Sequence, residues 1–397
     1  MNNYSSHRVA IVVSHPIQHF CPQYSSWSRL PGVDLKVFFA SKHGLSPYHD
    51  INFGTEVRWN LTLDFDHFFL PGAEGKPVDK DTDSSGLDTS LAAFDPDVVI
   101  CYGYAQKLQR RAIAWAKGRG KRLFMISDSE LRHRRSWPVR LAKKLVLPTV
   151  LRKPDVFLTV GDANEAYYRN YGIGDHRLVR TFFPIDVGLF EEAMPRRTAI
   201  RADIRQRHGI PEDHFVVLTV GKLVDWKRQA DLIRAVAQLR AEGASVTALL
   251  AGTGTDEAAL HSLAAQGAAN DIVFLGFVSP ESLVDYYVGT DTYVHCSSIE
   301  PHSLAISEAI FSGVPVVLSD RCGSYGPSDD VRPGLNGYVY PCGDVGALAG
   351  KLARLAGCRE LRDRMGAESR AFGLAAQALA HGKALQQALE LVDSRSH

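Results

Sequence analysis

Several features common in secreted, membrane-spanning or nucleic-acid-binding proteins are missing from this 397-residue sequence. Its six cysteines are scattered, with no Cys-x-x-Cys pair and no Cys/His ligand spacing, which argues against a disulfide framework or a zinc site. The 45 basic and 44 acidic residues give a net charge of +1, which argues against bulk binding of nucleic acid. No apolar run approaches the roughly 18 residues of a membrane-spanning helix. The apolar run at 9–13 is too short for a signal peptide, so we expect a cytoplasmic protein with reduced thiols.

Short runs rich in Val, Ile and Leu alternate with longer segments of helical pattern, which predicts parallel sheets covered by helices on both faces. The sequence thus predicts the α/β class, with two doubly wound domains and a ligand site in the cleft between them. We place the domains at 1–190 and 191–372. A helix and tail at 373–397 follow, and in one arrangement they pack back on the first domain. The segment 74–88 is rich in Gly, Asp, Lys and Ser and is expected to be a mobile loop. The expected strands are 9–13, 35–40, 98–102, 123–127, 156–160, 216–220, 246–251, 272–275, 292–296 and 314–318.

Glu300 and Glu308 are the most informative pair in the sequence, because residues eight apart lie on one face of a helix. Pro301 suits the first position of a helix, so we expect a helix to begin there, just after Glu300. Ionised carboxylates only accept hydrogen bonds, which suits the hydroxyl groups of a ribose or a hexose. The start of a helix also favours a phosphate. The alternative is a solvated helix face.

Three further segments of the second half indicate a phosphate-bearing ligand. Gly221 ends a predicted strand and is followed by Lys222 and Lys227, which could neutralise a diphosphate. Another strand ends in Gly252-Thr253-Gly254, a pattern that is also common in ordinary strand-to-helix turns. The segment 274–278 could read the edge of a base and cover its ring, or it is a plain core strand.

These motifs occur in a fixed order, and together they resemble the retaining GT-B glycosyltransferases of glycosyltransferase family 4. The resemblance covers roughly 215–355. Ser-His-Pro-Ile-Gln at 14–18 is similar to a bacterial subgroup of that family. The resemblance implies two Rossmann-like domains facing across a cleft. It also implies transfer of a sugar from a nucleoside diphosphate sugar to an acceptor hydroxyl with retention, and no required metal or other cofactor. Bacterial cell-envelope polysaccharide or glycolipid synthesis is the expected setting.

The resemblance also implies roles for individual residues of the second domain. Lys222 and Lys227 would grip the diphosphate, Glu300 the donor sugar and Glu308 the ribose. Pro301-His302 replaces the usual Phe-Gly, which leaves the sugar open, and His302 could itself reach a sugar hydroxyl or a phosphate. Asp329 and Asp330 are interpreted as a solvated turn and not as a metal site. The remaining donor-site candidates are Gly221, Gly252 and Gly254 in the loops, Leu275 and Phe277 beside the base, and the amides of Ser303 and Leu304 at the phosphate.

The first domain supplies candidates for the acceptor side of the cleft. His15, Gln18 and His19 follow the first strand and could contact the acceptor or the donor phosphate. Asp128 follows another strand and is the candidate for orienting or deprotonating the acceptor hydroxyl, although Asp also caps helices well. Glu130 is a second candidate. We therefore predict Asp128, Lys227 and Glu300 as the catalytic residues.

The segment 131–153 combines Arg and Lys with Trp and Leu, which suits the surface of an anionic membrane. This interpretation predicts a lipid-linked acceptor and a peripheral position on the inner face of the membrane. The alternative is a solvated basic helix face.

Two other functions stay open for the whole chain. A nucleotide-sugar epimerase on the same architecture would need no second acceptor. A non-catalytic subunit would bind a nucleotide sugar without transferring it. The presence of Lys227, Glu300 and Glu308 favours the transferase over this second alternative.

Overall fold

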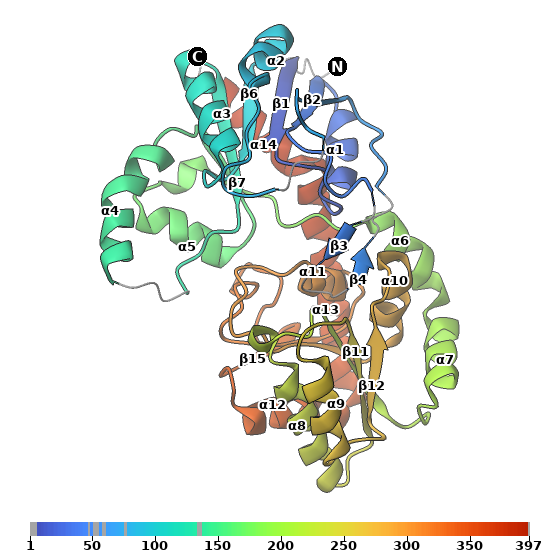
Figure 1. Ribbon diagram of the computed structural model, residues 1–397. Coiled ribbons are helices and arrows are strands. Elements are labelled where there is room, and N and C mark those ends of the chain that lie inside the picture. The colour runs from blue at the N-terminus through green and yellow to red at the C-terminus, as the bar shows by residue number, and fades with distance from the viewer. Residues whose placement is uncertain are drawn as a thin grey trace.

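The computed structural model describes residues 6–46, 48–50, 55–57, 61–74, 78–132 and 137–395. Two parallel sheets form the centres of two α/β domains, one above the other in Figure 1. The first sheet has the order β5-β2-β1-β6-β7-β8-β9 and the second has the order β12-β11-β10-β13-β14-β15. The strands of the first sheet are β1 (His7–Val13), β2 (Val33–Phe39), β5 (His67–Phe69), β6 (Val98–Tyr102), β7 (Arg122–Ser127), β8 (Val156–Thr159) and β9 (Leu178–Arg180). Those of the second are β10 (Phe215–Val220), β11 (Val246–Ala251), β12 (Ile272–Gly276), β13 (Thr292–His295), β14 (Val316–Ser319) and β15 (Gly337–Tyr340).

Helices cover both faces of each sheet, as the buried apolar runs require. In the first domain, α1 and α14 cover one face and α2 to α5 cover the other. In the second, α8, α9, α12 and α13 cover one face, and α6, α7, α10 and α11 cover the other. The first-domain helices are α1 (Cys21–Ser28), α2 (Leu87–Phe94), α3 (Lys107–Gly118), α4 (Trp137–Leu151) and α5 (Asp162–Asn170). The others are α6 (Val187–Ala193), α7 (Arg197–His208), α8 (Gln229–Ala241), α9 (Glu257–Ala265), α10 (Pro280–Gly289), α11 (Leu304–Phe311), α12 (Val345–Ala356), α13 (Arg359–Ala378) and α14 (Ala384–Asp393).

The pleat of the strands explains how one apolar run serves two cores. Along β1, Val9, Ile11 and Val13 point to the face covered by α1, and Ala10 and Val12 point to the opposite face. Each of the ten expected strands coincides with an observed one to within two residues. The α/β prediction with two parallel-sheet domains is therefore confirmed.

The strands that the sequence did not reveal are short and lie mostly at the edges of the sheets. They are β5, β9 and β15, together with the antiparallel pair β3 (Tyr48–Asp50) and β4 (Thr55–Val57). Strands of three or four residues carry too little apolar pattern to be recognised. The predicted 74–88 loop holds three buried side chains, Thr82, Ser84 and Leu87, and α2 begins within it at Leu87. Residues 75–77 lie outside the described residues.

The chain crosses between the domains twice, near residue 183 and again near residue 380 (Figure 1). Ile185 already packs in the core of the second domain. Gln377, at the end of α13, holds the crossing by accepting a hydrogen bond from the Ile185 amide and donating one to the Phe183 carbonyl. Beyond it, Leu385 and Leu389 of α14 pack in the core of the first domain. The predicted boundaries at 190 and 372 remain predictions. Among the described residues, no helix is both long and apolar enough to cross a bilayer.

Candidate active site between the two domains

A cavity of about 990 Å³ lies between the domains, and both domains contribute to its wall. The first domain supplies Gln18 and His19, from the loop after β1. The link between α13 and α14 supplies His381. The second domain supplies residues that follow the carboxyl ends of its strands, where doubly wound folds bind ligands. Those predicted from the sequence are Gly221, Lys227, Gly252, Phe277, Glu300, His302, Ser303, Leu304 and Glu308.

Glu300 is the centre of a hydrogen-bonded network in this wall. Its carboxylate forms an ion pair with Lys227 and lies 3.0 Å from Nε2 of His295. The Ser297 hydroxyl donates to the same carboxylate oxygen at 3.3 Å. Nδ1 of His295 lies 3.0 Å from the hydroxyl of Tyr293. A neutral imidazole satisfies both contacts when Nε2–H donates to Glu300 and Nδ1 accepts from Tyr293.

The network keeps Glu300 ionised. Burial favours the neutral acid, but the hydrogen bond and charge of His295 and the charge of Lys227 outweigh it and lower the pKa of Glu300 to about 2. Burial lowers the pKa of His295, against the opposing effect of Glu300. A fixed carboxylate beside a lysine can accept hydrogen bonds from hydroxyl groups while the ammonium group faces an anion.

Glu308 has the opposite environment. It lies on α11 and lines the same cavity, and burial raises its pKa to about 7, with the Tyr287 hydroxyl partly offsetting the effect. The two glutamates therefore differ in charge state near neutral pH. Glu300 stays ionised and only accepts hydrogen bonds, whereas Glu308 gains or loses its proton near pH 7.

The loops that follow β10 and β11 need glycine because their backbones pack closely against each other. A Cβ atom on Gly252 would lie 2.0 Å from the carbonyl oxygen of Gly221, and one on Gly254 would lie 2.3 Å from that of Leu223. The two loops also exchange backbone hydrogen bonds, Gly221 to Ala251 and Leu223 to Thr253. Gly221 and Gly252 line the cavity and Gly254 does not. The Gly-x-Gly pattern thus fixes one strand-end loop against the next.

Two details of the predicted Glu300–Glu308 helix are wrong. The helix begins at Leu304 and not at Pro301. Glu300 lies in the loop before the helix, as expected, and is paired with Cys322 in an isolated bridge. The amide of Ser303 is also already occupied, because it donates to the Ser324 hydroxyl at 3.0 Å. The first amides of α11 that lack an intrahelical acceptor belong to Leu304 and Ala305, and both residues line the cavity.

Two of the predicted donor-site residues, Lys222 and Leu275, are not among the residues that line the cavity. Lys222 is half-buried and, unlike Lys227, is not among the residues that line the cavity. Leu275 packs against the core of the second domain, whereas Phe277 and Val278 line the cavity. The apolar cover expected beside a base therefore comes from the turn after β12.

Asp329 and Asp330 do not form the solvated turn that the sequence suggested. Their side chains are 0% and 2% exposed, and they lie 3.5 and 3.7 Å from Nε2 of His302. Burial acts to lower the pKa of His302, but the negative charges of Asp329, Asp330 and Asp128 raise it. The turn is buried because residues from the first domain cover it: the Asp162 amide donates to Asp329 at 2.6 Å.

The first-domain candidates differ in their distance from the cavity. Gln18 and His19 line it, whereas His15 is not among the lining residues, and its Nδ1 lies 2.9 Å from the Ser14 hydroxyl. Burial lowers the pKa of both histidines to about 4, helped by His43 at His15 and by His15 at His19. They are therefore neutral near pH 7 and can exchange hydrogen bonds without adding positive charge.

Asp128 and Glu130 lie in the loop after β7 and are not among the residues that line the cavity. Asp128 is exposed, and its charge reaches His302 across the domain interface. The alternative role as a helix cap is wrong, because α4 begins only at Trp137. Glu130 accepts a hydrogen bond from the Arg132 amide. Their roles at the acceptor stay predictions.

Sequence reasoning missed the residues that hold the site together. His295 was counted only as part of a strand, although a histidine at a strand's carboxyl end, five residues before Glu300, was a usable signal. Asp162 was not among the candidate site residues, yet its carboxylate accepts hydrogen bonds from the amide and the hydroxyl of Ser328 in the second domain. That contact has no signal in the sequence, because the partners are 166 residues apart.

Comparison with known proteins finds a family model that matches the second domain. Residues 200–372 match the family model "Glycosyl transferases group 1". EpsD of Bacillus subtilis strain 168, a putative glycosyltransferase, is 29% identical over 172 residues, which are 43% of this chain and 44% of EpsD. The lipopolysaccharide core biosynthesis glycosyltransferase LpsE of Rhizobium meliloti strain 1021 is 32% identical over 162 residues, 41% of this chain and 45% of LpsE. The chain thus aligns with less than half the length of these curated relatives.

Solved structures match the whole fold at low sequence identity. A glycosyltransferase from Rickettsia africae ESF-5 superposes with a TM-score of 0.74 at 12% identity, covering 98% of this chain and 99% of that one. Anabaena Alr3699/HepE, solved with UDP and glucose, superposes with a TM-score of 0.67 at 18% identity, covering 98% and 100%. The fold is therefore GT-B, two Rossmann-like domains with a cavity between them.

Proposed function

We propose that this protein is a glycosyltransferase that moves a sugar from a nucleoside diphosphate sugar to an acceptor hydroxyl. One observation carries the proposal: Lys227, Glu300, Glu308 and the start of α11 all face one cavity between two GT-B domains. The half of the site that holds these residues lies in the segment that matches the glycosyl transferases group 1 model. A neighbour of the same fold, HepE, was solved with UDP-glucose, which makes such a donor a reasonable ligand for the shared architecture.

The donor would lie across the strand ends of the second domain. Its diphosphate would meet the ammonium group of Lys227 and the amides of Leu304 and Ala305, which together oppose the negative charge that grows on the leaving group. Glu300 would accept hydrogen bonds from the donor sugar, and Glu308 from the ribose. Phe277 would cover the base.

In the resting site Lys227 is paired with Glu300. A bound diphosphate competes for this ammonium group, so donor binding would free Glu300 to accept sugar hydroxyls. The network through His295 and Ser297 then keeps the carboxylate oriented. By family resemblance we propose retention at the anomeric carbon through front-face attack, with the leaving phosphate helping to deprotonate the acceptor. No enzymic nucleophile and no metal are needed for that chemistry.

The acceptor would enter from the first domain, past Gln18 and His19, with Asp128 orienting its hydroxyl. Bacterial envelope polysaccharide or glycolipid synthesis is the setting we propose, since relatives such as LpsE are named for lipopolysaccharide synthesis. Assignment to family 4 rests on the motif order and on the Ser-His-Pro-Ile-Gln loop.

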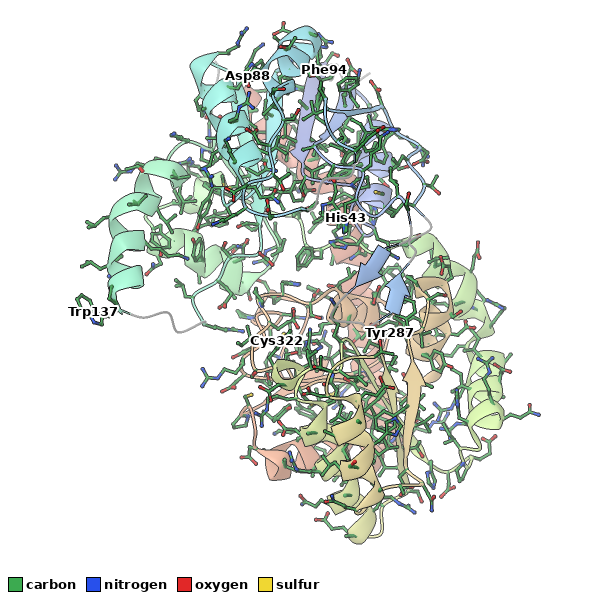
Figure 2. The ribbon with its side chains drawn as sticks, viewed as in Figure 1. His43, Asp88, Phe94, Trp137, Tyr287 and Cys322 are labelled. Atoms are coloured by element: carbon green, nitrogen blue, oxygen red, sulfur yellow. The ribbon has the colours of Figure 1, made fainter. Side chains whose placement is uncertain are left out.

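A lipid-linked acceptor would suit the exposed face of α4. Five of the twelve exposed large hydrophobic residues in the described part of the chain lie at 131–146. Trp137, Leu141 and Leu145 are spaced for one helix face, and Trp137 points away from the body of the molecule (Figure 2). Leu147 faces the opposite way and anchors the helix in the core, so it does not belong to the exposed face.

The basic residues of this segment do not all share one role. Lys144, Arg152 and Lys153 are exposed on or just after α4. Arg132 instead reaches the carbonyl of Cys322 and lies over the ring of Tyr325 in the second domain. Residues 133–136 and the side chain of Arg140 lie outside the described residues. We propose that this face contacts an anionic membrane surface, with the cations near its end attracting the headgroups.

A thermal-shift panel of nucleoside diphosphates tests the donor site directly. Wild-type protein should be stabilised by one diphosphate above the others, and Lys227→Ala should lose that stabilisation. Lys222→Ala is the matched control, because Lys222 does not line the cavity. If no diphosphate at millimolar concentration stabilises the folded protein, the chain is better explained as a non-catalytic subunit.

Product analysis separates transfer from the remaining alternative. The protein is incubated with the matched nucleotide sugar, with and without a panel of hydroxyl acceptors. Free nucleoside diphosphate and a glycosylated product that appear only with acceptor support transfer. Conversion of the donor into an isomeric nucleotide sugar without acceptor would show an epimerase.

A further inference from the structure

His302, Asp329 and Asp330 form a buried cluster at the junction of the two domains, and the donor chemistry proposed above does not use the two aspartates. His302 precedes α11 and lines the cavity, while both aspartates come from the loop between β14 and β15. The three side chains are 2%, 0% and 2% exposed. Two carboxylates removed from water at one point are costly unless a cation neutralises them.

The distances in the cluster are not those of a hydrogen-bonded ion pair. Nε2 of His302 lies 3.5 Å from a carboxylate oxygen of Asp329 and 3.7 Å from one of Asp330. A charged imidazolium bound to a carboxylate would draw it to about 2.7–2.9 Å. Neither ring nitrogen of His302 has a hydrogen-bond partner among the described residues. Ligand atoms around a tetrahedral ion with bonds of about 2.0–2.1 Å lie roughly 3.3 Å apart. The two nitrogen-to-oxygen distances here are 3.5 and 3.7 Å, and the three candidate ligand atoms lie within 4.8 Å of one another.

The carboxylates are held in place by partners that leave acceptor capacity for another ligand. One oxygen of Asp329 accepts from the Asp162 amide at 2.6 Å and the other from the Asp330 amide at 2.8 Å. The Ser307 hydroxyl donates to Asp330 at 2.7 Å. A carboxylate offers about four acceptor positions, so each can still bind an ion.

The nearest guanidinium does not neutralise the cluster by direct contact. Arg180, on β9 of the first domain, is hydrogen-bonded to Asp162 and to Glu165. It also donates to the carbonyl of Ser328, next to the cluster. Its contacts hold the loop of the second domain against the first domain, and the Asp329 and Asp330 carboxylates face Nε2 of His302 instead of this guanidinium.

The geometry points to a divalent metal-ion site formed by His302, Asp329 and Asp330. One imidazole nitrogen and two carboxylates suit Zn²⁺ or Mn²⁺, whereas Ca²⁺ and Mg²⁺ prefer oxygen ligands alone. A bound ion would tie the loop that touches Asp162 to His302 in the cavity wall. The ion would have a structural role at the contact between the domains, and it would take no part in any step of the proposed transfer. The assignment therefore does not depend on the proposed function.

Metal binding by the full-length protein is the direct test. Chelator-treated wild-type protein is titrated with ZnCl₂, MnCl₂, CaCl₂ and MgCl₂, and the unfolding midpoint and the ions bound per chain are measured. Zn²⁺ or Mn²⁺ should raise the midpoint, chelator should reverse the rise, and Ca²⁺ and Mg²⁺ should have little effect. His302→Gln and Asp330→Asn should each lose one bound ion per chain and the accompanying shift.

Two variants make the result specific to this cluster. Ser307→Ala keeps all three ligands and removes only the hydrogen bond to Asp330, so ion affinity should fall about 10- to 100-fold. His208→Gln removes a half-buried histidine that pairs with Tyr286 elsewhere, and should bind the ion as wild type does. The assignment is wrong if wild-type protein binds no Zn²⁺ or Mn²⁺. It is equally wrong if His302→Gln keeps the same ion count and shift, since the ions then bind elsewhere.

Discussion

Replacing Glu308 by glutamine is expected to stabilise the protein at neutral pH while it weakens nucleotide binding. Burial raises the pKa of Glu308 from 4.5 to about 7. In the folded protein the carboxyl group therefore keeps its proton over a range in which the unfolded chain has lost it. The difference of about 2.5 in pKa corresponds to up to about 3 kcal/mol, at roughly 1.36 kcal/mol for each unit.

The sign of the pH dependence follows from proton binding. Between pH 4.5 and about 7 the folded state holds one more proton than the unfolded state, so stability falls as pH rises through this window. Above about 7 both states are ionised and the contribution is flat. Wild-type protein should thus lose about 2 kcal/mol relative to Glu308→Gln between roughly pH 5.5 and 7.

Urea unfolding of both proteins at a series of pH values measures this difference. Glu390→Gln, which removes an exposed carboxylate on α14, controls for the loss of charge alone. If the gap between wild type and Glu308→Gln stays constant from pH 5.5 to 8, burial does not hold the proton on Glu308 and the reasoning fails.

Nucleotide binding supplies a second measurement on the same pair of proteins. If the ionised carboxylate accepts the ribose hydroxyls, the dissociation constant of the matched diphosphate should rise about tenfold for each pH unit below the pKa. Glu308→Gln should bind more weakly at pH 8 and lack this dependence. A variant that is more stable and still binds as wild type would show that Glu308 does not contact the ligand.

Three further predictions test the cavity wall and the surface. Lys227→Met should reduce transfer about 10²- to 10³-fold, because the leaving diphosphate loses its counter-charge, whereas Lys222→Met should have a much smaller effect in the same kinetic assay. Gly252→Ala should destabilise by about 3 kcal/mol or more in denaturant unfolding, since its Cβ would lie 2.0 Å from a carbonyl oxygen. Gly350→Ala, with nothing within 4 Å inside α12, should instead stabilise by up to about 1 kcal/mol, and equal losses at both glycines would contradict the packing argument. Trp137→Ser should weaken binding to anionic vesicles in a flotation assay, and unchanged flotation would argue against membrane contact through α4.

Local pattern was sufficient for most of the architecture. Runs such as those at 98–102 and 246–251 are buried on both faces, so their composition alone identifies central strands of parallel sheets. The strands missed, such as β5 and β9, have only three residues and lie at the ends of the first sheet, where little apolar pattern is required.

Part of the candidate site could also be predicted from the sequence, and part of it could not. Lys227, Glu300 and Glu308 follow from the sequence, because the motifs that position them lie next to the strands and the helix that carry them. Leu275 and Lys222 share those motifs but are not among the residues that line the cavity. Which residues of a motif reach the cavity depends on the turn after each strand. The start of the helix was misplaced at Pro301, because the backbone of Ser303 is extended and the helix begins only after it. The Ser303 amide donates to Ser324, from a loop 21 residues further on.

The sequence by itself determined the strand order along the chain, the two-domain α/β class and the carboxylates and lysine of the proposed donor site, since each depends on residues close together in the chain. Only the tertiary structure decided the protonation of Glu308 and Glu300, because their pKa values depend on which side chains bury them and pair with them. The tertiary structure also decided that the side chains of Asp329 and Asp330 are buried. They are adjacent acids that look solvated in sequence, and they become buried because the Asp162 loop of the other domain closes over them.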